Sequence, residues 1–252
     1  VALGGFHSQA GWISFIAVAA GMLLVAHRSR FFTEAEERSP EQTSGNSNIA
    51  YLVPFAVLLA ATMLTSAVSA GFDWLYPLRV VAVLVALGIG WRFYRFSPFR
   101  TSFTAVGAGV LVFVMWIVLV PDSPEQSAAF DLALFEQGGL YATGWLIFRF
   151  IGATVTVPLA EELAFRGYLM ARLSGVREAD SQAVPFSWIA LAVSAVLFGA
   201  MHTNIAAGVL AGVAYGLVRY HKGKVLDAVV AHAVTNACLS IYVTAMGRWS
   251  VW

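Results

Sequence analysis

The chain has 252 residues, of which 59% are hydrophobic and only 12% are charged, and its mean hydropathy is +0.75. Soluble domains carry roughly 25% charged residues, so this composition excludes a soluble globular protein and indicates an integral membrane protein whose apolar residues face lipid. The net charge of +1 gives no sign of a nucleic-acid partner, and the single cysteine, Cys238, excludes a disulfide within the chain.

The apolar runs predict an all-α, polytopic membrane bundle of about eight transmembrane helices, because each run is near the roughly 20 residues that a bilayer requires. The expected spans are 9–27, 49–70, 75–95, 103–121, 149–172, 187–203, 205–221 and 225–246. A polar stretch after the first span predicts a flexible linker. We therefore divide the chain into an N-terminal helix, a linker and a membrane domain, at residues 1–32, 33–48 and 49–252. No methionine opens the sequence, so we expect a piece of a longer protein.

The charges of the loops predict an orientation. Arginine and lysine follow every second predicted helix, at Arg28, Arg30, Arg38, Arg92, Arg95, Arg100, Arg172, Arg177, Arg219, Lys222 and Lys224. The segment between the fourth and fifth helices, 121–140, contains Asp and Glu but no Lys or Arg. Basic loops favour the cytoplasmic side, so we expect both ends of this sequence to lie outside.

Two adjacent glutamates, Glu161 and Glu162, lie in an otherwise apolar segment. A charge at bilayer depth costs on the order of 3 kcal/mol on insertion scales, which makes a functional role the first interpretation. Arg149 and Arg172 bound this segment and would be about 34 Å apart on a helix. We therefore expect each arginine to reach its own interface, with Glu161 near the midplane.

The spacing of Glu162 and Arg166 predicts an ion pair, because residues four apart share a helix face and Glu stands on the N-terminal side. Glu161 points about 100° away around the helix and is free to face another group. The alternative interpretation is a buried pair that only locks two helices together, which leaves the second glutamate unexplained.

Three more polar side chains lie in other apolar helices: His202 near the end of the sixth predicted span, and His232 and Asn236 on one face of the eighth. Together with a free glutamate they supply the base and the hydrogen-bond donors that an acyl-transfer site requires. Ser194 and Cys238 have no recognisable nucleophile spacing to a histidine, so a water activated by Glu161 is the simpler nucleophile.

These residues form three ordered motifs: Glu-Glu-x-x-x-Arg at 161–166, Phe-x-x-x-His at 198–202 and His-x-x-x-Asn at 232–236. In this order they resemble the CPBP family, which contains the type II CAAX prenyl endopeptidases and the bacterial Abi, or bacteriocin-processing, proteases. The resemblance covers roughly residues 145–246 and implies an intramembrane endopeptidase. It implies that Glu161 activates water with His202 assisting, that His232 and Asn236 hold the oxyanion, and that Glu162, Arg166 and Phe198 support the site.

The family has also been described as metalloprotease-like, and Glu161, His202 and His232 are plausible zinc ligands. Asn236 and the lack of a His-Glu-x-x-His run favour a glutamate mechanism without metal or other cofactor. Zinc remains the alternative.

The residues from Gly4 to Trp12, which include His7, resemble the last His-containing helix of an exosortase, a membrane transpeptidase. One subgroup, exosortase E, is fused to a CPBP protease domain. The resemblance implies that this chain is the protease half with the exosortase tail attached, and His7 would then serve a site whose Cys and Arg lie upstream.

Two other function classes compete with the protease. A non-catalytic CPBP-like scaffold or immunity protein would use the same fold, and a proton-coupled transporter would use buried Glu and His as a relay. For the protease we expect a membrane-anchored protein or peptide as substrate, the lipid bilayer as surroundings, and a multi-pass location in the bacterial inner membrane.

Overall fold

The computed structural model describes residues 44–69, 72–94, 102–136, 138–176 and 184–252. All of them belong to the second of two compact units, Thr43–Trp252. The predicted helix at 9–27, His7 and most of the predicted linker lie outside the described residues. The proposed domain division and the exosortase resemblance therefore stay predictions.

The described residues form helices and no strands, which confirms the predicted all-α class. In chain order the α-helices are α3 (Ser44–Val68), α4 (Tyr76–Gly90), α5 (Phe103–Leu119), α6 (Pro124–Phe135), α7 (Gly139–Ile151), α8 (Val157–Glu162), α9 (Met170–Leu173), α10 (Trp188–Ala200), α11 (Ile205–Lys222) and α12 (Val225–Met246). The shorter elements are two π-helical segments, η3 (Gly152–Thr156) and η4 (Leu163–Leu169), and two 3-10 turns, η2 (Trp91–Phe93) and η5 (Trp249–Val251).

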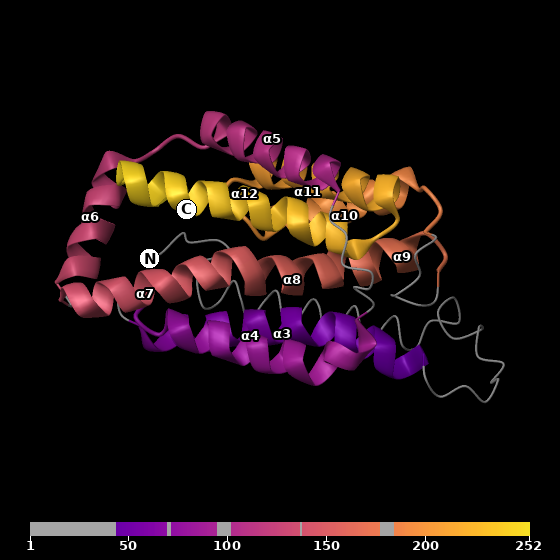
Figure 1. Cartoon of the computed structure of the whole chain (residues 1–252), viewed down its shortest axis with the longest axis horizontal. Coiled ribbons are helices and arrows are strands. Elements are labelled where there is room, and N and C mark those ends of the chain that lie inside the picture. The colour runs from indigo at the N-terminus through magenta and orange to yellow at the C-terminus, as the bar shows by residue number, and fades with distance from the viewer. Residues whose placement is uncertain (1–43, 70–71, 95–101, 137, 177–183) are drawn as a thin grey trace, which may run out of the picture. The chain divides into compact units, whose positions relative to one another are not determined.

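The segments α7, η3, α8, η4 and α9 form one continuous helical rod, Gly139–Leu173. In Figure 1 this rod lies between the pair α3 and α4 on one side and a group formed by α5, α10, α11 and α12 on the other. The rod contacts α3 and α4 through α7, α8 and both π segments, and it contacts α12 through η3, α8 and η4. The glutamates, at the end of α8, are therefore enclosed by helices on both sides.

Every span expected after residue 48 corresponds to a helix. Among the described residues, four helices are long and apolar enough to cross a membrane, or five if the pair α5 and α6, bent by 111°, counts as one span. The expected span at 187–203 is shorter in the structure, because α10 ends at Ala200. Its 13 residues cover about 20 Å at 1.5 Å per residue. A hydrocarbon core is about 30 Å thick, so α10 alone does not cross it.

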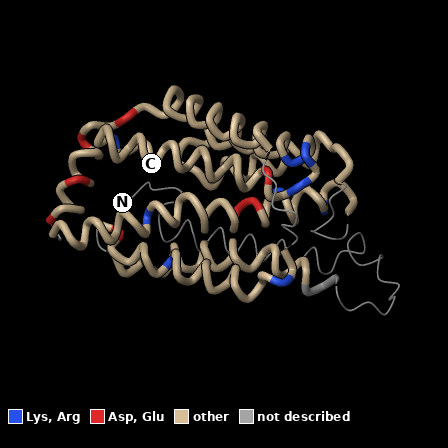
Figure 2. The backbone as a smooth tube through the Cα atoms, in the orientation of Figure 1, with Lys and Arg blue, Asp and Glu red and all other residues tan. Residues whose placement is uncertain are grey.

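The segment 121–140, expected to be an acidic loop, contains the helix α6. Ser250 connects it to the end of the chain, because its Oγ donates to Asp122 Oδ1 over 2.6 Å and accepts from the Ser123 N–H over 2.8 Å. Figure 2 shows acidic residues gathered at this end of the bundle and basic residues at the opposite end, beside α10 and α11. This is the charge asymmetry from which the orientation was predicted.

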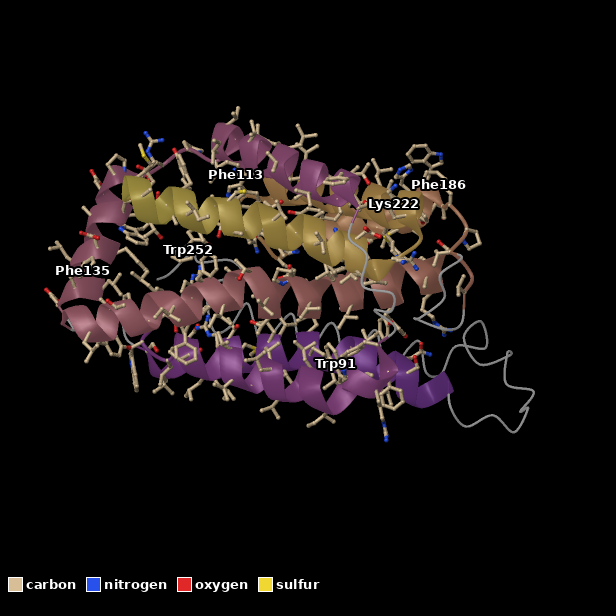
Figure 3. All side chains as sticks on the ribbon, in the orientation of Figure 1. Trp91, Phe113, Phe135, Phe186, Lys222 and Trp252 are labelled. Carbon is tan, nitrogen blue, oxygen red and sulfur yellow. The ribbon has the colours of Figure 1, made fainter. Side chains whose placement is uncertain are left out.

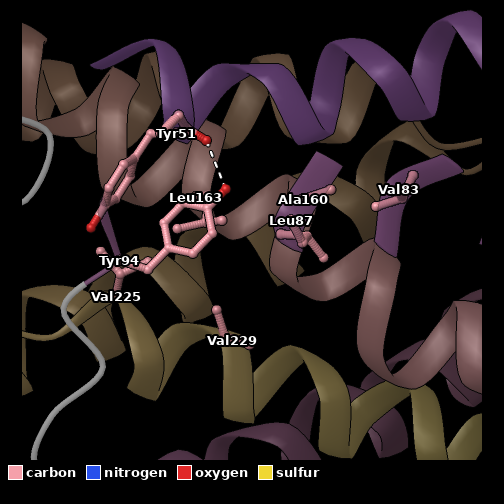
Figure 4. Close-up of a cluster of buried hydrophobic side chains, with 9 residues drawn as sticks. Tyr51, Val83, Leu87, Tyr94, Ala160, Leu163, Val225 and Val229 are labelled. Carbon is pink, nitrogen blue, oxygen red and sulfur yellow. Dashed lines mark hydrogen bonds between the residues drawn. The ribbon is translucent and has the colours of Figure 1, made fainter. Parts of the chain in front are cut away.

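A buried cluster holds α3, α4 and α8 together (Figure 4). Ala160 and Leu163 of the rod are fully buried against Tyr51 of α3. The Tyr94 hydroxyl donates to the carbonyl oxygen of Ala50 over 2.9 Å, so the one polar group of that ring is satisfied inside the apolar cluster. Outside this and the other clusters, large apolar side chains cover the bundle surface, as the sticks in Figure 3 show, which suits contact with lipid.

Helices α10 and α11 approach closely because small residues line their contact. Asn204 begins α11 by accepting from the Ala207 N–H over 3.1 Å, and Gly223, with φ of 72°, ends it in the left-handed conformation that glycine favours. A Cβ at Gly212 would lie only 2.9 Å from the Cα of Ala195 on α10. Because Gly212 has no side chain, α11 can pack closely against α10 in the interior of the bundle.

Replacing Gly212 by alanine is expected to lower the thermal unfolding temperature in detergent, because the added Cβ meets backbone atoms of Ala195 that cannot turn away. Overpacking of this kind costs about 1–3 kcal/mol. Gly107→Ala is the matched control, because a Cβ there has no neighbour within 4 Å and alanine favours the helix. Equal unfolding temperatures for the two variants would contradict the close contact between α10 and α11.

Candidate active site

The carboxylate of Glu162, at the end of α8, is the centre of the polar cluster. Its side chain is fully buried, and its Oε1 accepts from Arg166 Nη1 over 2.9 Å and lies 2.9 Å from Nδ1 of His232. The predicted pairing of Glu162 with Arg166 is present, and His232 is a second partner that helix spacing could not show. One oxygen atom therefore connects the rod to α12.

Arg166 is also fully buried and connects the rod to α11. Its Nη2 donates to the carbonyl oxygen of Gly212 over 2.9 Å. The guanidinium lies 4.3 Å from the ring centroid of Phe198 and 5.6 Å from that of Tyr215. Contact with aromatic faces stabilises a cation that water cannot reach, so Phe198 stabilises the buried charge of Arg166.

His232 is held by rings as well as by Glu162. Its imidazole stacks on Tyr215, with centroids 4.9 Å apart and planes 16° apart, and it meets Phe198 edge to face at 5.6 Å. Because Nδ1 points to Glu162, the Nε2 atom is the nitrogen that remains for other partners. Packing and a carboxylate together determine the orientation of this ring.

The π-helical segment η3 places a backbone carbonyl within reach of Asn236. At its end the Val157 N–H bonds to the carbonyl of Gly152, five residues earlier. In an α-helix the N–H bonds to the carbonyl four residues earlier. The Asn236 Nδ2 donates to the carbonyl oxygen of Ala153, in the same segment, over 2.8 Å. Single π turns inside α-helices are frequent at functional sites.

His202 lies in the turn that follows α10, not within the helix. Its backbone N–H bonds to Gly199 O over 3.0 Å, and its Nδ1 lies 2.9 Å from the carbonyl oxygen of Phe198. The imidazole packs against the rings of Phe198 and Trp116, with centroids 4.7 and 5.7 Å away. The bend after Ala200 therefore turns this histidine inward, toward Phe198 and Trp116.

His202, His232 and Asn236 line one cavity of about 160 Å³. This volume is large enough for several waters. The other lining residues come from α4, α5, the rod, α10, α11, α12 and the C-terminal segment, and they include Tyr76, Trp116, Arg149, Ala153, Val157, Phe198, Ala211, Tyr215, Thr235, Leu239 and Trp252. The structure thus brings three of the four predicted catalytic side chains together.

Glu161 is not among the residues that line this cavity. Its side chain is buried, with 8% exposed, and its Oε2 has no hydrogen-bond partner among the described groups. Unpaired buried carboxylate oxygens are expensive and call for an explanation. The Oε2 of Glu162 also lacks a hydrogen-bond partner, so the two neighbouring glutamates differ in that the Oε1 of Glu162 holds Arg166 and His232.

Arg149 occupies a different place from the one predicted. The rod begins at Gly139, ten residues before Arg149, because the intervening residues are apolar and extend the helix. The guanidinium lies 4.7 Å from the ring centroids of both Tyr76 and Trp252 and forms part of the cavity wall. The expectation that the helix starts at Arg149 was wrong, because it begins at Gly139, and the position of Arg149 relative to a membrane interface stays a prediction.

Tyr215, Trp116 and Tyr76 were not predicted as site residues, because a single aromatic residue in an apolar helix has no distinctive spacing. The two weak nucleophile candidates do not line the cavity either. Ser194 donates to Phe165 O over 3.4 Å, and Cys238 is half-buried on α12. The described part of the chain contains no group of three His, Cys, Asp or Glu side chains that could hold a metal ion. Glu161, His202 and His232 do not form such a group among the described residues, and the absence of a metal stays a prediction.

Comparison with known proteins found one match. Residues 143–238 match the family model described as type II CAAX prenyl endopeptidase Rce1-like. This range contains the rod from α7 onward, α10, α11 and the part of α12 that carries His232 and Asn236. No curated protein and no solved structure matches the chain.

Replacing Glu162 by glutamine is expected to destabilise the fold, because Arg166 keeps its charge in a fully buried position without a counter-ion. Breaking a buried ion pair from one side costs about 3–5 kcal/mol. The measurement is thermal unfolding of the purified protein in detergent. Glu161→Gln is the matched control, and it should change the unfolding temperature far less, because the Oε2 of Glu161 has no partner to lose. A larger loss in Glu161→Gln than in Glu162→Gln would contradict this assignment.

Proposed function

We propose that the chain is an intramembrane endopeptidase, because residues 143–238 match the family model of the type II CAAX prenyl endopeptidases. In this proposal it hydrolyses a peptide bond of a membrane-associated protein or peptide, using a water that a glutamate activates. A multi-pass helical bundle with a polar cavity enclosed by apolar helices supports this function. We place the protein in the bacterial inner membrane.

Glu161 is the proposed base, and the observation that supports this role most directly is that its Oε2 has no hydrogen-bond partner among the described groups while Arg166 and His232 are held by Glu162 instead. A general base needs a free lone pair to accept a proton from water. Glu162 also has an unpartnered Oε2, but its Oε1 holds Arg166 and His232, and protonation of the carboxylate would weaken those contacts. Proton transfer also requires the Glu161 carboxylate to turn toward the cavity, and the π segments η3 and η4 on either side of α8 are the sites where the rod departs from α-helical register.

His202, His232 and Asn236 are the proposed partners of the scissile carbonyl. His202 lies in the cavity wall on the turn after α10 and would assist the water. In the imidazolium form, His232 would donate its Nε2–H to the oxyanion while Nδ1–H donates to Glu162. The Asn236 amide would use the N–H that Ala153 O does not occupy. Donors held in place before the reaction stabilise the charge that develops on the oxygen.

Glu161→Gln is expected to reduce the rate of cleavage by roughly 10²–10⁴, because glutamine keeps the size and hydrogen bonding of the side chain but cannot accept the proton. The assay follows cleavage of membrane-anchored substrates in liposomes by the full chain, and the unfolding temperature of the variant verifies that the fold survives. Full activity in Glu161→Gln would end the glutamate mechanism.

A chelator provides the test of the metal alternative. In the proposed mechanism, the wild-type chain keeps its activity after extensive treatment with a chelator. Loss of activity that returns only with added zinc would overturn the metal-free proposal. Absence of any cleavage by a folded wild-type chain over a broad set of membrane-anchored substrates would favour the non-catalytic relative.

His232→Ala is expected to lower kcat by roughly 10²–10³, the range measured for loss of one oxyanion donor in a soluble protease. The matched control is His221→Ala on α11, since that histidine is exposed and does not line the cavity. Equal activity of both variants would exclude His232 from the reaction.

A further inference from the structure

Arg149 is a cation in the cavity wall, and the proposed reaction assigns no role to it. It lies on α7, half-buried, and its guanidinium is held between the rings of Tyr76 and Trp252, both 4.7 Å from it. Figure 3 shows Trp252 between α12 and α7. A charged side chain in a membrane-spanning segment is costly, which makes a functional role the first interpretation.

The acidic residue that acts on Arg149 is already paired elsewhere. Asp73 attracts Arg149 electrostatically, but its carboxylate bonds to Arg79, with both of its oxygens 2.9 Å from Nη2. The ion pairs between described residues do not include Arg149. Its positive charge is therefore not neutralised at contact distance within this part of the structure.

The two rings orient the guanidinium without using its hydrogen-bond donors. Aromatic contact acts on the flat faces of an arginine, whereas its five N–H groups lie in the plane. A planar guanidinium with a free edge matches the two oxygens of a carboxylate, which it binds through parallel hydrogen bonds. An aromatic clamp also keeps the side chain in place before binding, so less conformational entropy is lost.

We propose that Arg149 binds a carboxylate of the peptide substrate and thereby positions the scissile bond beside His202 and His232. The inference rests on the proposed function and adds a charge requirement to it. Arg149 and both histidines line the same cavity of about 160 Å³. The recognised carboxylate must accordingly lie near the cleaved bond, either at the C-terminus of the peptide or on an acidic side chain.

Cleavage kinetics of the full chain with matched substrates test the proposal. Three versions of one cleaved peptide are compared: the free C-terminal acid, its C-terminal amide, and a version in which every Asp and Glu becomes Asn or Gln. For wild type, the KM of at least one neutralised version should be at least tenfold higher than that of the unmodified peptide. The version that shows this increase identifies the source of the carboxylate. Arg149→Gln should remove this discrimination, and Arg149→Lys should retain part of it because the charge remains while the fork is lost.

Arg248→Gln is the matched control, since Arg248 also lies over an aromatic ring, that of Tyr242, but is exposed and does not line the cavity. It should keep the discrimination of wild type. The proposal is overturned if wild type cleaves all three peptides with equal KM, or if Arg149→Gln lowers kcat equally on all of them.

A binding measurement separates this proposal from the proposed function. N-acetyl-leucine and its amide are titrated against the full chain while tryptophan fluorescence is recorded, with Trp252→Phe to identify the signal. Saturable binding of the acid, at least tenfold tighter than that of the amide and lost in a folded Arg149→Gln variant, supports the carboxylate site even if no peptide is cleaved. Equal binding of acid and amide by wild type contradicts it.

Discussion

A single carboxylate oxygen, Oε1 of Glu162, holds the centre of this bundle together. It accepts from Arg166 of the same rod and lies at hydrogen-bond distance from His232 of α12, and Arg166 in turn donates to α11 at Gly212. Charged groups without water are stable only when their hydrogen bonds and opposite charges are present at once. These hydrogen bonds therefore fix the relative positions of the rod, α11 and α12 and tolerate little displacement. Packing of their apolar faces alone would allow several relative positions.

Aromatic rings pack around these charged groups and further restrict their positions. Phe198 lies against Arg166, His202 and His232, so one side chain contacts a member of each motif. Tyr215 stacks on His232 from the other helix of the α10–α11 pair. The rings exclude water from the ion pair and also limit the rotation of both imidazoles. In the proposed reaction the donors would therefore need no rearrangement when negative charge develops on the substrate.

Sequence reasoning predicted those features that depend on local spacing. Apolar runs located the helices after residue 48, and four-residue spacing paired Glu162 with Arg166. The features that it missed depend on contacts between distant segments or on small departures from α-helical register. Nothing local distinguishes an Arg149 at a membrane interface from one held between Tyr76 and Trp252, which lie 73 residues before it and 103 after it. Likewise, α6 has a polar composition that also suits a loop, and its attachment depends on Ser250 near the other end of the domain.

The different environments of Glu161 and Glu162 explain why two adjacent glutamates are useful at this depth. A carboxylate that holds both Arg166 and His232 cannot also exchange protons freely, because each protonation would weaken the contacts that maintain the bundle. In the proposed mechanism, a second carboxylate, one residue away and without those partners, accepts the proton while Glu162 maintains the structure. The adjacent π segments η3 and η4 alter the helical register around α8. The proposal thereby divides structural support and proton transfer between neighbouring side chains of the same kind.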